Sequence, residues 1–175
     1  MDLAAHCLDD LTVQFGKIRS LAEGAIAQAS DEDLFRSADP ESNSIAIVMR
    51  HVSGNLKSRF TDFLTTDGEK PDRRRDGEFE MPPGTTRGTL VADWNLAFSR
   101  LESTLGSLTP ADLSSEVRIR GERMTVLAAL HRSLAHTSMH AGQIVMLAKQ
   151  LRGSSWRTLS IPRGQSETFS GQRRF

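Results

Sequence analysis

The chain has one cysteine, no long apolar run and no excess of either charge, and each of these absences excludes a class of protein. Cys7 is the only cysteine, so no intramolecular disulfide can form. Lys plus Arg and Asp plus Glu both number 22, which gives no electrostatic reason to expect nucleic acid or an anionic membrane as the main partner. No apolar run approaches the roughly 18 residues that a membrane-spanning helix requires.

The N-terminal sequence MDLAAHCLDDL begins with an acid and carries further charges, unlike a secretory signal peptide. We therefore expect a cytoplasmic protein. With 175 residues, of which 38% are hydrophobic and 25% are charged, the chain has the composition of one soluble domain that is large enough to bury a core.

Apolar residues recur three or four positions apart in four long stretches, which is typical of amphipathic helices. These stretches are residues 3–27, 44–64, 88–106 and 124–151. Strong alternation typical of strands is absent. We therefore predict an all-α fold, an antiparallel four-helix bundle in residues 1–151 with a long connection between its second and third helices. Residues 152–175, with scattered apolar groups, are predicted to form an extended C-terminal tail that packs over the bundle or a partner, or is disordered.

Short polar segments follow the first and third predicted helices. In SDEDLF, Ser30 is a predicted N-cap, and in TPADLS the predicted N-cap is Thr109, with Pro110 at the first helical position. The long connection, residues 65–86, is rich in glycine, proline and charge, so it is functional, a crossover or disordered. Its arginines at 73–75 stand among acidic residues, which predicts a solvated, self-neutralised loop rather than a nucleic-acid site.

The histidines of the fourth predicted helix divide into two sets. His136 and His140 share a face because they are four residues apart, whereas His131 points roughly 160° away from them. A histidine pair with this spacing presents two imidazoles to one ion, and His51 from the second helix would complete a three-histidine metal site with open positions. The alternative is that each ring simply forms hydrogen bonds at a boundary between helices.

Three further side chains are candidates for substrate contact or for supporting a ligand. Asn55 and Arg59 follow His51 at intervals of one helical turn, where Asn55 would bind substrate and Arg59 would anchor a carboxylate. The alternatives are a helix-contact amide and a surface arginine paired with Asp62 or Asp67.

Gln143 follows His140 by three residues and is positioned to form a hydrogen bond with that ligand. Gly142 has no side chain, so a neighbouring helix could approach closely there. Cys7 lies on the apolar stripe of the first helix and is more typical of a small buried hydrophobe than of a metal ligand.

The segments HTSMHAGQI and NSIAIVMRHVSGNL resemble the DinB-like superfamily, the damage-inducible four-helix-bundle family and not the DNA polymerase that shares its name. More narrowly, the run from HVSGNLKSRF to DGEFE and the tail IPRGQSETF are similar to an uncharacterised branch of that superfamily. The resemblance covers most of the chain. Its specific part is a histidine on the second helix together with H-x-x-x-H-x-G-Q on the fourth.

This resemblance implies a homodimer with a divalent metal, often zinc or nickel, held at the positions that match His51, His136 and His140. His131 matches a position that is often histidine but is not a usual ligand. Characterised relatives include thiol-dependent transferases and an isomerase that use bacillithiol or mycothiol.

An ion with three neutral ligands and an open position lowers the pKa of a bound water or binds a thiol as thiolate. The leading expectation is therefore transfer of a low-molecular-weight thiol to an electrophile. The alternatives are a metal-dependent hydrolase and a non-enzymatic, metal-binding structural or stress protein.

Overall fold

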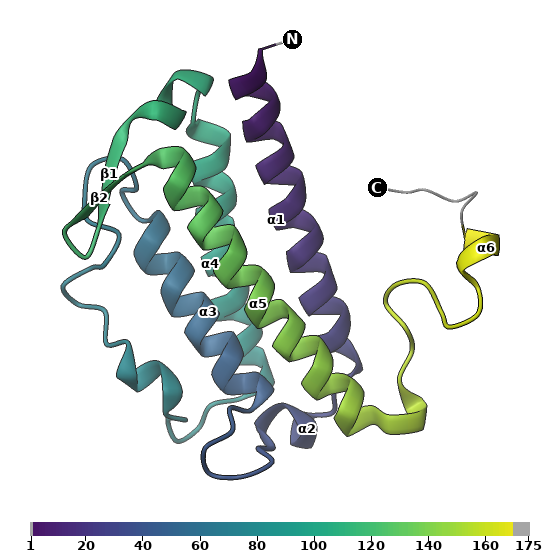
Figure 1. Ribbon diagram of the computed structural model, residues 1–175. Coiled ribbons are helices and arrows are strands. Elements are labelled where there is room, and N and C mark those ends of the chain that lie inside the picture. The colour runs from purple at the N-terminus through teal and green to yellow at the C-terminus, as the bar shows by residue number, and fades with distance from the viewer. Residues whose placement is uncertain (1, 170–175) are drawn as a thin grey trace.

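The computed structural model describes residues 2–169 and is mainly helical (Figure 1). Its four long helices are α1 (Leu3–Gln28), α3 (Ile45–Phe60), α4 (Arg87–Ser107) and α5 (Val126–Arg152). The shorter helical segments are α2 (Asp31–Phe35), η1 (Asp76–Phe79), η2 (Pro110–Ser114), η3 (Gly153–Ser155) and α6 (Ser166–Phe169). The four helices predicted from periodicity are present. The predicted helical fold is therefore correct in the main, and one small hairpin, β1 (Glu116–Ile119) and β2 (Glu122–Thr125), adds to it.

Side-chain caps explain where the helices begin. The hydroxyls of Ser44, Thr86 and Thr125 each accept the backbone N–H three residues further on, at the starts of α3, α4 and α5. Ser30 caps α2 as predicted, in a reciprocal arrangement with Asp33. At η2, the backbone N–H of Thr109 donates to Asp112, and Pro110 occupies the first position as predicted.

The apolar stripes of the long helices meet in one core. Helix α3 packs against both α4 and α5, and α1 packs against α5. The largest fully buried side chains include Phe15, Met49, Leu56, Phe98, Leu130 and Ile144. Trp94 is also buried, so the aromatic residues at helical spacing belong to the core.

The long connection determines the direction of α4. It runs back along α3, so that α3 and α4 point the same way (Figure 1), with Lys57 bonded to Asp93 and the Thr104 hydroxyl bonded to the carbonyl of Phe60. The predicted antiparallel arrangement is therefore wrong for α3 and α4. The prediction is correct for α3 and α5, where His51 contacts His136.

Helix α3 ends four residues before the predicted position 64. Thr61 has an extended backbone and its hydroxyl donates to the carbonyl of Lys57, and Asp62 then adopts a positive φ of 48°. Phe63 still returns to the core, where it is buried. The apolar pattern therefore extended the predicted helix beyond its true end, because the buried Phe63 follows the turn at helical spacing.

The hairpin is the element that the helical periodicity missed. Its strands are four residues long, and Val117 and Ile119 alternate with exposed neighbours and pack into the core. The two turn residues, Arg120 and Gly121, have positive φ values of 56° and 76°, as in a tight hairpin turn. Glycine in that turn between short alternating segments was the available signal.

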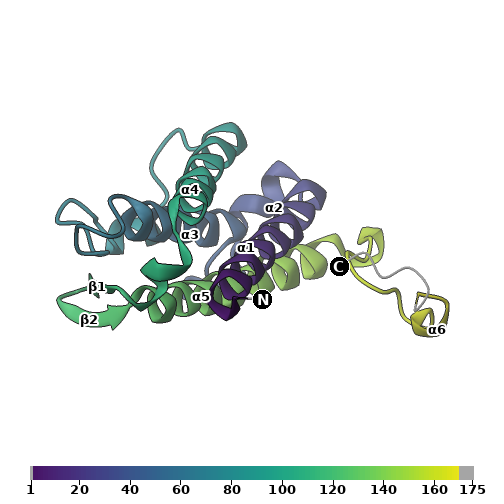
Figure 2. The same cartoon turned by 90° about the horizontal axis from the view of Figure 1, so that it is seen from above.

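The described part of the tail begins on the surface of α1. The side-chain amide of Gln28 exchanges two hydrogen bonds with the backbone of Arg157, and Leu159 lies over Gly24. Helix α6 lies apart from the long helices in both views (Figures 1 and 2). Residues 170–175 of the predicted tail lie outside the described residues. None of the described helices has the length and apolarity needed to cross a membrane.

The hairpin turn supplies a test of backbone strain. A Cβ at Gly121 would meet no atom within 4 Å, so Gly121→Ala should destabilise through its positive φ alone, by about 1 kcal/mol. Gly16 has equally open space but lies inside α1, so Gly16→Ala should stabilise by about 0.5–1 kcal/mol. Urea unfolding of both variants measures the opposite signs, and a stabilised Gly121→Ala protein would contradict the turn assignment.

Candidate metal centre

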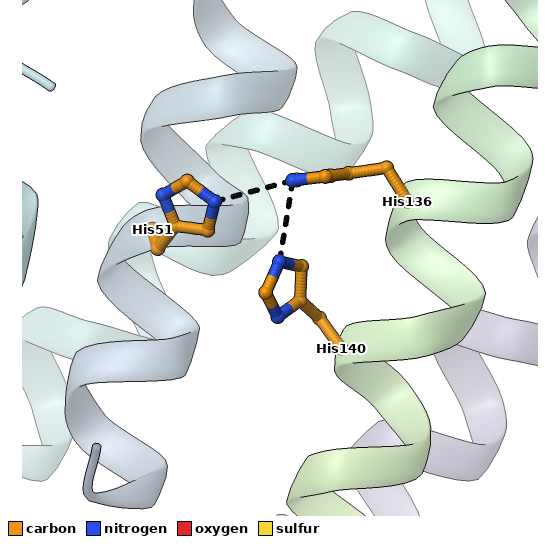
Figure 3. A group of neighbouring side chains, drawn as sticks. All are labelled: His51, His136 and His140. Carbon is orange, nitrogen blue, oxygen red and sulfur yellow. Dashed lines mark hydrogen bonds between the residues drawn. The ribbon is translucent and has the colours of Figure 1, made fainter. Parts of the chain in front are cut away.

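Three histidines from two helices point toward one another (Figure 3). His51 comes from α3, and His136 and His140 come from successive turns of α5. The Nε2 atom of His136 lies 3.1 Å from Nε2 of His51 and 3.2 Å from Nε2 of His140. The three ligand atoms all lie within 4.8 Å of one another. The antiparallel packing of α3 on α5 therefore brings together residues that are 85 positions apart.

Hydrogen bonds place the imidazole proton of two of these rings on Nδ1, the ring nitrogen that points away from the other histidines. Nδ1 of His51 lies 2.9 Å from the carboxylate of Glu78, and Nδ1 of His140 lies 2.7 Å from the amide oxygen of Gln143. Both oxygens are acceptors, so each Nδ1 carries the proton and each Nε2 keeps its lone pair. This is the form of histidine that binds a metal.

The environment of His136 disfavours its protonated form. Burial lowers its pKa to about 4, and the neighbouring His140 and His51 rings contribute in the same direction. Burial also lowers the pKa of His140, against the opposing effect of its bond with Gln143. Both shifts favour the neutral ring, which is the form that can bind a metal ion.

The carboxylate of Glu78 is itself held on both sides. Two nitrogens of Arg73 donate to it, at 2.8 and 2.9 Å, in addition to the bond from His51. Burial by itself would raise the pKa of Glu78, but the bonds from His51 and Arg73 outweigh it and keep the pKa below its ordinary value. Glu78 is thus an ionised acceptor for His51.

Glu78 reaches α3 only because residue 54 is glycine. A Cβ built at Gly54 would stand 2.2 Å from Oε1 of Glu78 and 2.6 Å from its Cδ. Any side chain here would displace the carboxylate from His51. The glycine in the segment HVSGNL therefore allows the connection to contact the histidine centre.

The arginines of the connection are paired with its own acids, as expected, because Arg73 bonds Glu78 and Arg75 lies 3.5 Å from Asp76, but two expectations about solvent exposure are wrong. Arg73 is not solvated, since its side chain is only 5% exposed and bonds both Glu78 and Glu69. Arg59 is not a surface residue paired with Asp62 or Asp67. It is buried and bonds Glu69 at 2.9 Å. The reason is tertiary: the connection folds onto α3, so these arginines and their acidic partners are withdrawn from solvent together.

Asp67 bonds the connection to the hairpin turn rather than to an arginine side chain. Its carboxylate accepts the backbone N–H groups of Arg120 and Gly121 at 2.8 and 2.7 Å, which ties the connection to the hairpin turn. Gly68 completes this contact through a backbone bond to Arg118. The connection is thus a structured crossover from α3 to α4 that is also bonded to the hairpin.

The remaining predicted residues lie in distinct environments. Asn55 is buried and lines a pocket beside the histidines, and Gln143 bonds His140. His131 is exposed on the other side of α5, where its ring bonds the carbonyl of Leu127. The angular separation of His131 from His136 is therefore real.

Cys7 is half-buried against the core and is not part of the histidine group, as predicted. The expectation for Gly142 is wrong, because a Cβ there would meet nothing within 4 Å among the described residues. No neighbouring helix of the same chain approaches at that point. Glu78, Arg73 and Ser133 were not predicted as residues of the site, since no spacing rule connects a residue of the loop or a lone serine to a histidine on another helix.

The donor set fits a divalent metal ion. It consists of neutral imidazole nitrogens, which suit zinc, copper, iron and nickel. Among residues 2–169, no fourth histidine, cysteine or carboxylate joins the group. A closed structural zinc site has four protein ligands, whereas three ligands leave a position for water or substrate.

The contact between Gly54 and Glu78 predicts the protonation pattern of His51. In the metal-free protein, ¹⁵N chemical shifts should show Nδ1–H on His51, and Gly54→Ala should remove this pattern by displacing Glu78. Loss of the bond should destabilise the fold by about 1–3 kcal/mol. Gly142→Ala, on α5 in open space, is the matched control and should leave the His51 shifts unchanged. Unchanged shifts in Gly54→Ala would contradict the role of Glu78.

The low pKa of His136 predicts that the metal-free protein loses stability as the pH falls from about 6.5 to about 4. In this range the unfolded chain binds a proton at His136 that the folded chain does not, so the free energy of unfolding decreases, by up to about 3 kcal/mol. Denaturant unfolding at several pH values measures the slope. His136→Gln should flatten it between these two pKa values, and equal slopes would contradict the shift.

Residues 2–165 of the chain match the family described as "Protein of unknown function (DUF1572)". No curated protein and no solved structure matches the chain. The matched residues include all three histidines of the centre and the whole connection that carries Glu78. Since the match covers most of its length, the chain belongs to the DUF1572 family.

Proposed function

We propose that His51, His136 and His140 hold a divalent metal ion, with zinc or nickel the best candidates, and that the protein is a metal-dependent enzyme of the DinB-like superfamily. The observation that carries this proposal is the convergence of three Nε2 atoms without a fourth ligand among the described residues. The reaction we propose is transfer of a low-molecular-weight thiol to an electrophile.

The architecture supports the superfamily assignment. Four long helices with a structured crossover between α3 and α4 are consistent with the DinB-like four-helix bundle that the motifs resemble. We also propose a cytoplasmic homodimer. Exposed apolar side chains on α1 and α5, among them Val13, Met139 and Met146, favour an interface with a second copy.

The ion would supply Lewis acidity, which lowers the pKa of a thiol or a water and so provides a nucleophile at neutral pH. The chain itself supplies orientation. Glu78 and Gln143 hold the proton on Nδ1 of His51 and His140, which directs both Nε2 lone pairs to the same point. Arg73 keeps Glu78 ionised, and Asn55 offers an amide beside the centre.

Metal content tests the ligand set directly. Purified protein should contain about one divalent ion per chain, and His51→Ala or His136→Ala should lose it while the helical circular dichroism persists. His131→Ala is the matched control, because His131 is exposed on the same helix as His136 and should leave the metal content unchanged. Glu78→Gln should weaken metal affinity by roughly 10–100-fold. Metal retained in His51→Ala would overturn the three-histidine site.

Activity separates the three functional classes. Metal-loaded protein should accelerate the reaction of a model electrophile with one member of a panel of low-molecular-weight thiols, and His136→Ala should abolish this rate. Hydrolysis of esters or amides without any thiol would favour a hydrolase instead. Unfolding or dimer dissociation on metal removal, with no activity in either assay, would favour a structural protein.

A further inference from the structure

A pocket of about 200 Å³ lies beside the histidine centre, and five arginines line it. They are Arg59, Arg73, Arg75, Arg120 and Arg132. They come from four separate segments: α3, the connection, the hairpin turn and α5. Among the described residues, no acidic side chain lines the pocket. In a chain with a net charge of zero, this is a local concentration of positive charge.

The nearby acids offset only part of this charge. Glu69 bonds Arg59, Arg73 and Arg120 together, so one carboxylate is shared among three guanidinium groups. Glu78 offsets Arg73 but also serves His51. Burial lowers the pKa of Arg59, the bond with Glu69 raises it, and the charges of Arg73 and Arg120 lower it further. The cations in the wall thus repel one another.

The other two arginines have weak partners. Arg75 lies 3.5 Å from the carboxylate of Asp76, which is fully exposed, and Arg132 lies 3.4 Å from that of Glu122, which is 70% exposed. Ion pairs this exposed contribute little and are readily exchanged. Both guanidinium groups are therefore free to bind an anion in the pocket.

A buried polar side chain in the wall has no hydrogen-bond partner within residues 2–169. Ser133 is 6% exposed and its buried Oγ is unpartnered, and Asn55, which is 8% exposed, lines the pocket beside it. Buried polar groups are nearly always hydrogen-bonded. An unpartnered group that lines a pocket therefore indicates a ligand that supplies the missing bond.

We propose that this pocket binds the carboxylate or phosphate group of a small anionic ligand. Guanidinium groups match both anions by forming paired hydrogen bonds, and Asn55 and Ser133 add neutral donors. The volume is below the roughly 300–1,000 Å³ of pockets for drug-sized ligands, so the pocket fits a small molecule or one end of a larger one.

The position of the pocket defines the other end of this ligand. His51 and His136 line the same pocket, so a ligand anchored by the arginines extends to the histidine centre. The extension of the ligand to the histidine centre rests on the proposed metal-dependent function, and it implies that the substrate of the proposed enzyme is an anion. Recognition of the anion by the arginines does not require the metal.

Calorimetric titration of the full-length protein at low ionic strength tests the proposal with succinate, inorganic phosphate and the neutral analogue succinamide. At least one of the two anions should bind saturably, and succinamide should not. Arg132→Gln and Arg75→Gln should each weaken anion binding by roughly 10–100-fold, the usual effect of losing a charge-assisted hydrogen bond. Both residues are about half exposed, so their replacement leaves the fold intact.

Arg123→Gln is the matched control, since Arg123 is an exposed arginine on β2 that does not line the pocket. It should bind the anions as the unaltered protein does. Equal weakening in Arg123→Gln, or no saturable binding of succinate or phosphate, would overturn the proposal. The tighter of the two anions identifies the group that the pocket prefers.

His140→Ala separates this proposal from the metal site, because His140 does not line the pocket. Anion affinity unchanged in His140→Ala supports an independent subsite, even if neither protein contains metal. Anion binding abolished in His140→Ala, while the protein remains folded, would overturn recognition by the arginines alone.

Discussion

The carboxylate of Glu78 lies buried between a histidine and an arginine, and the path of the connection depends on this contact. A buried carboxylate is strongly unfavourable unless it is paired and hydrogen-bonded. Here His51 and Arg73 both supply bonds, and Gly54 leaves the space for them. The segment after α3 therefore returns along that helix instead of extending into solvent, and α4 starts at the opposite end from where α3 finished.

The same contact gives the histidine centre its electrostatic character. Two different environments adjoin: neutral imidazoles whose pKa values burial lowers, and a wall of arginines. A divalent ion beside uncompensated guanidinium groups would be repelled by them. Glu69 and Glu78 reduce that repulsion, and an anionic ligand would reduce it further. The proposed metal centre and the proposed anion pocket thus adjoin, and a single anionic ligand could contact both.

The elements that sequence reasoning found are those whose signal is local. Helical periodicity located all four long helices, and the spacing of His136 and His140 placed them on one face with His131 away from it. The hairpin escaped because four-residue strands carry too few positions to establish alternation. The end of α3 was predicted four residues too far along the chain, because Phe63 is buried although the helix ends at Phe60. Apolar periodicity indicates which residues are buried and does not by itself show that the backbone is still helical.

The sequence by itself determined the four long helices, the caps at Ser30 and Thr109, and the common face of His136 and His140, because these follow from residue type and spacing along one chain. Only the tertiary structure decided that the antiparallel contact of α3 with α5 brings the ring of His51 against that of His136, which is 85 residues further along the chain. It also decided the environment of the charges. Arg59 and Arg73 are typical of solvated residues in the sequence, but Arg59 is buried and the Arg73 side chain is only 5% exposed because the connection folds onto α3. Their acidic partners are near in the sequence, but spacing does not show that such pairs are withdrawn from solvent, since this happens only when the connection packs on the helix.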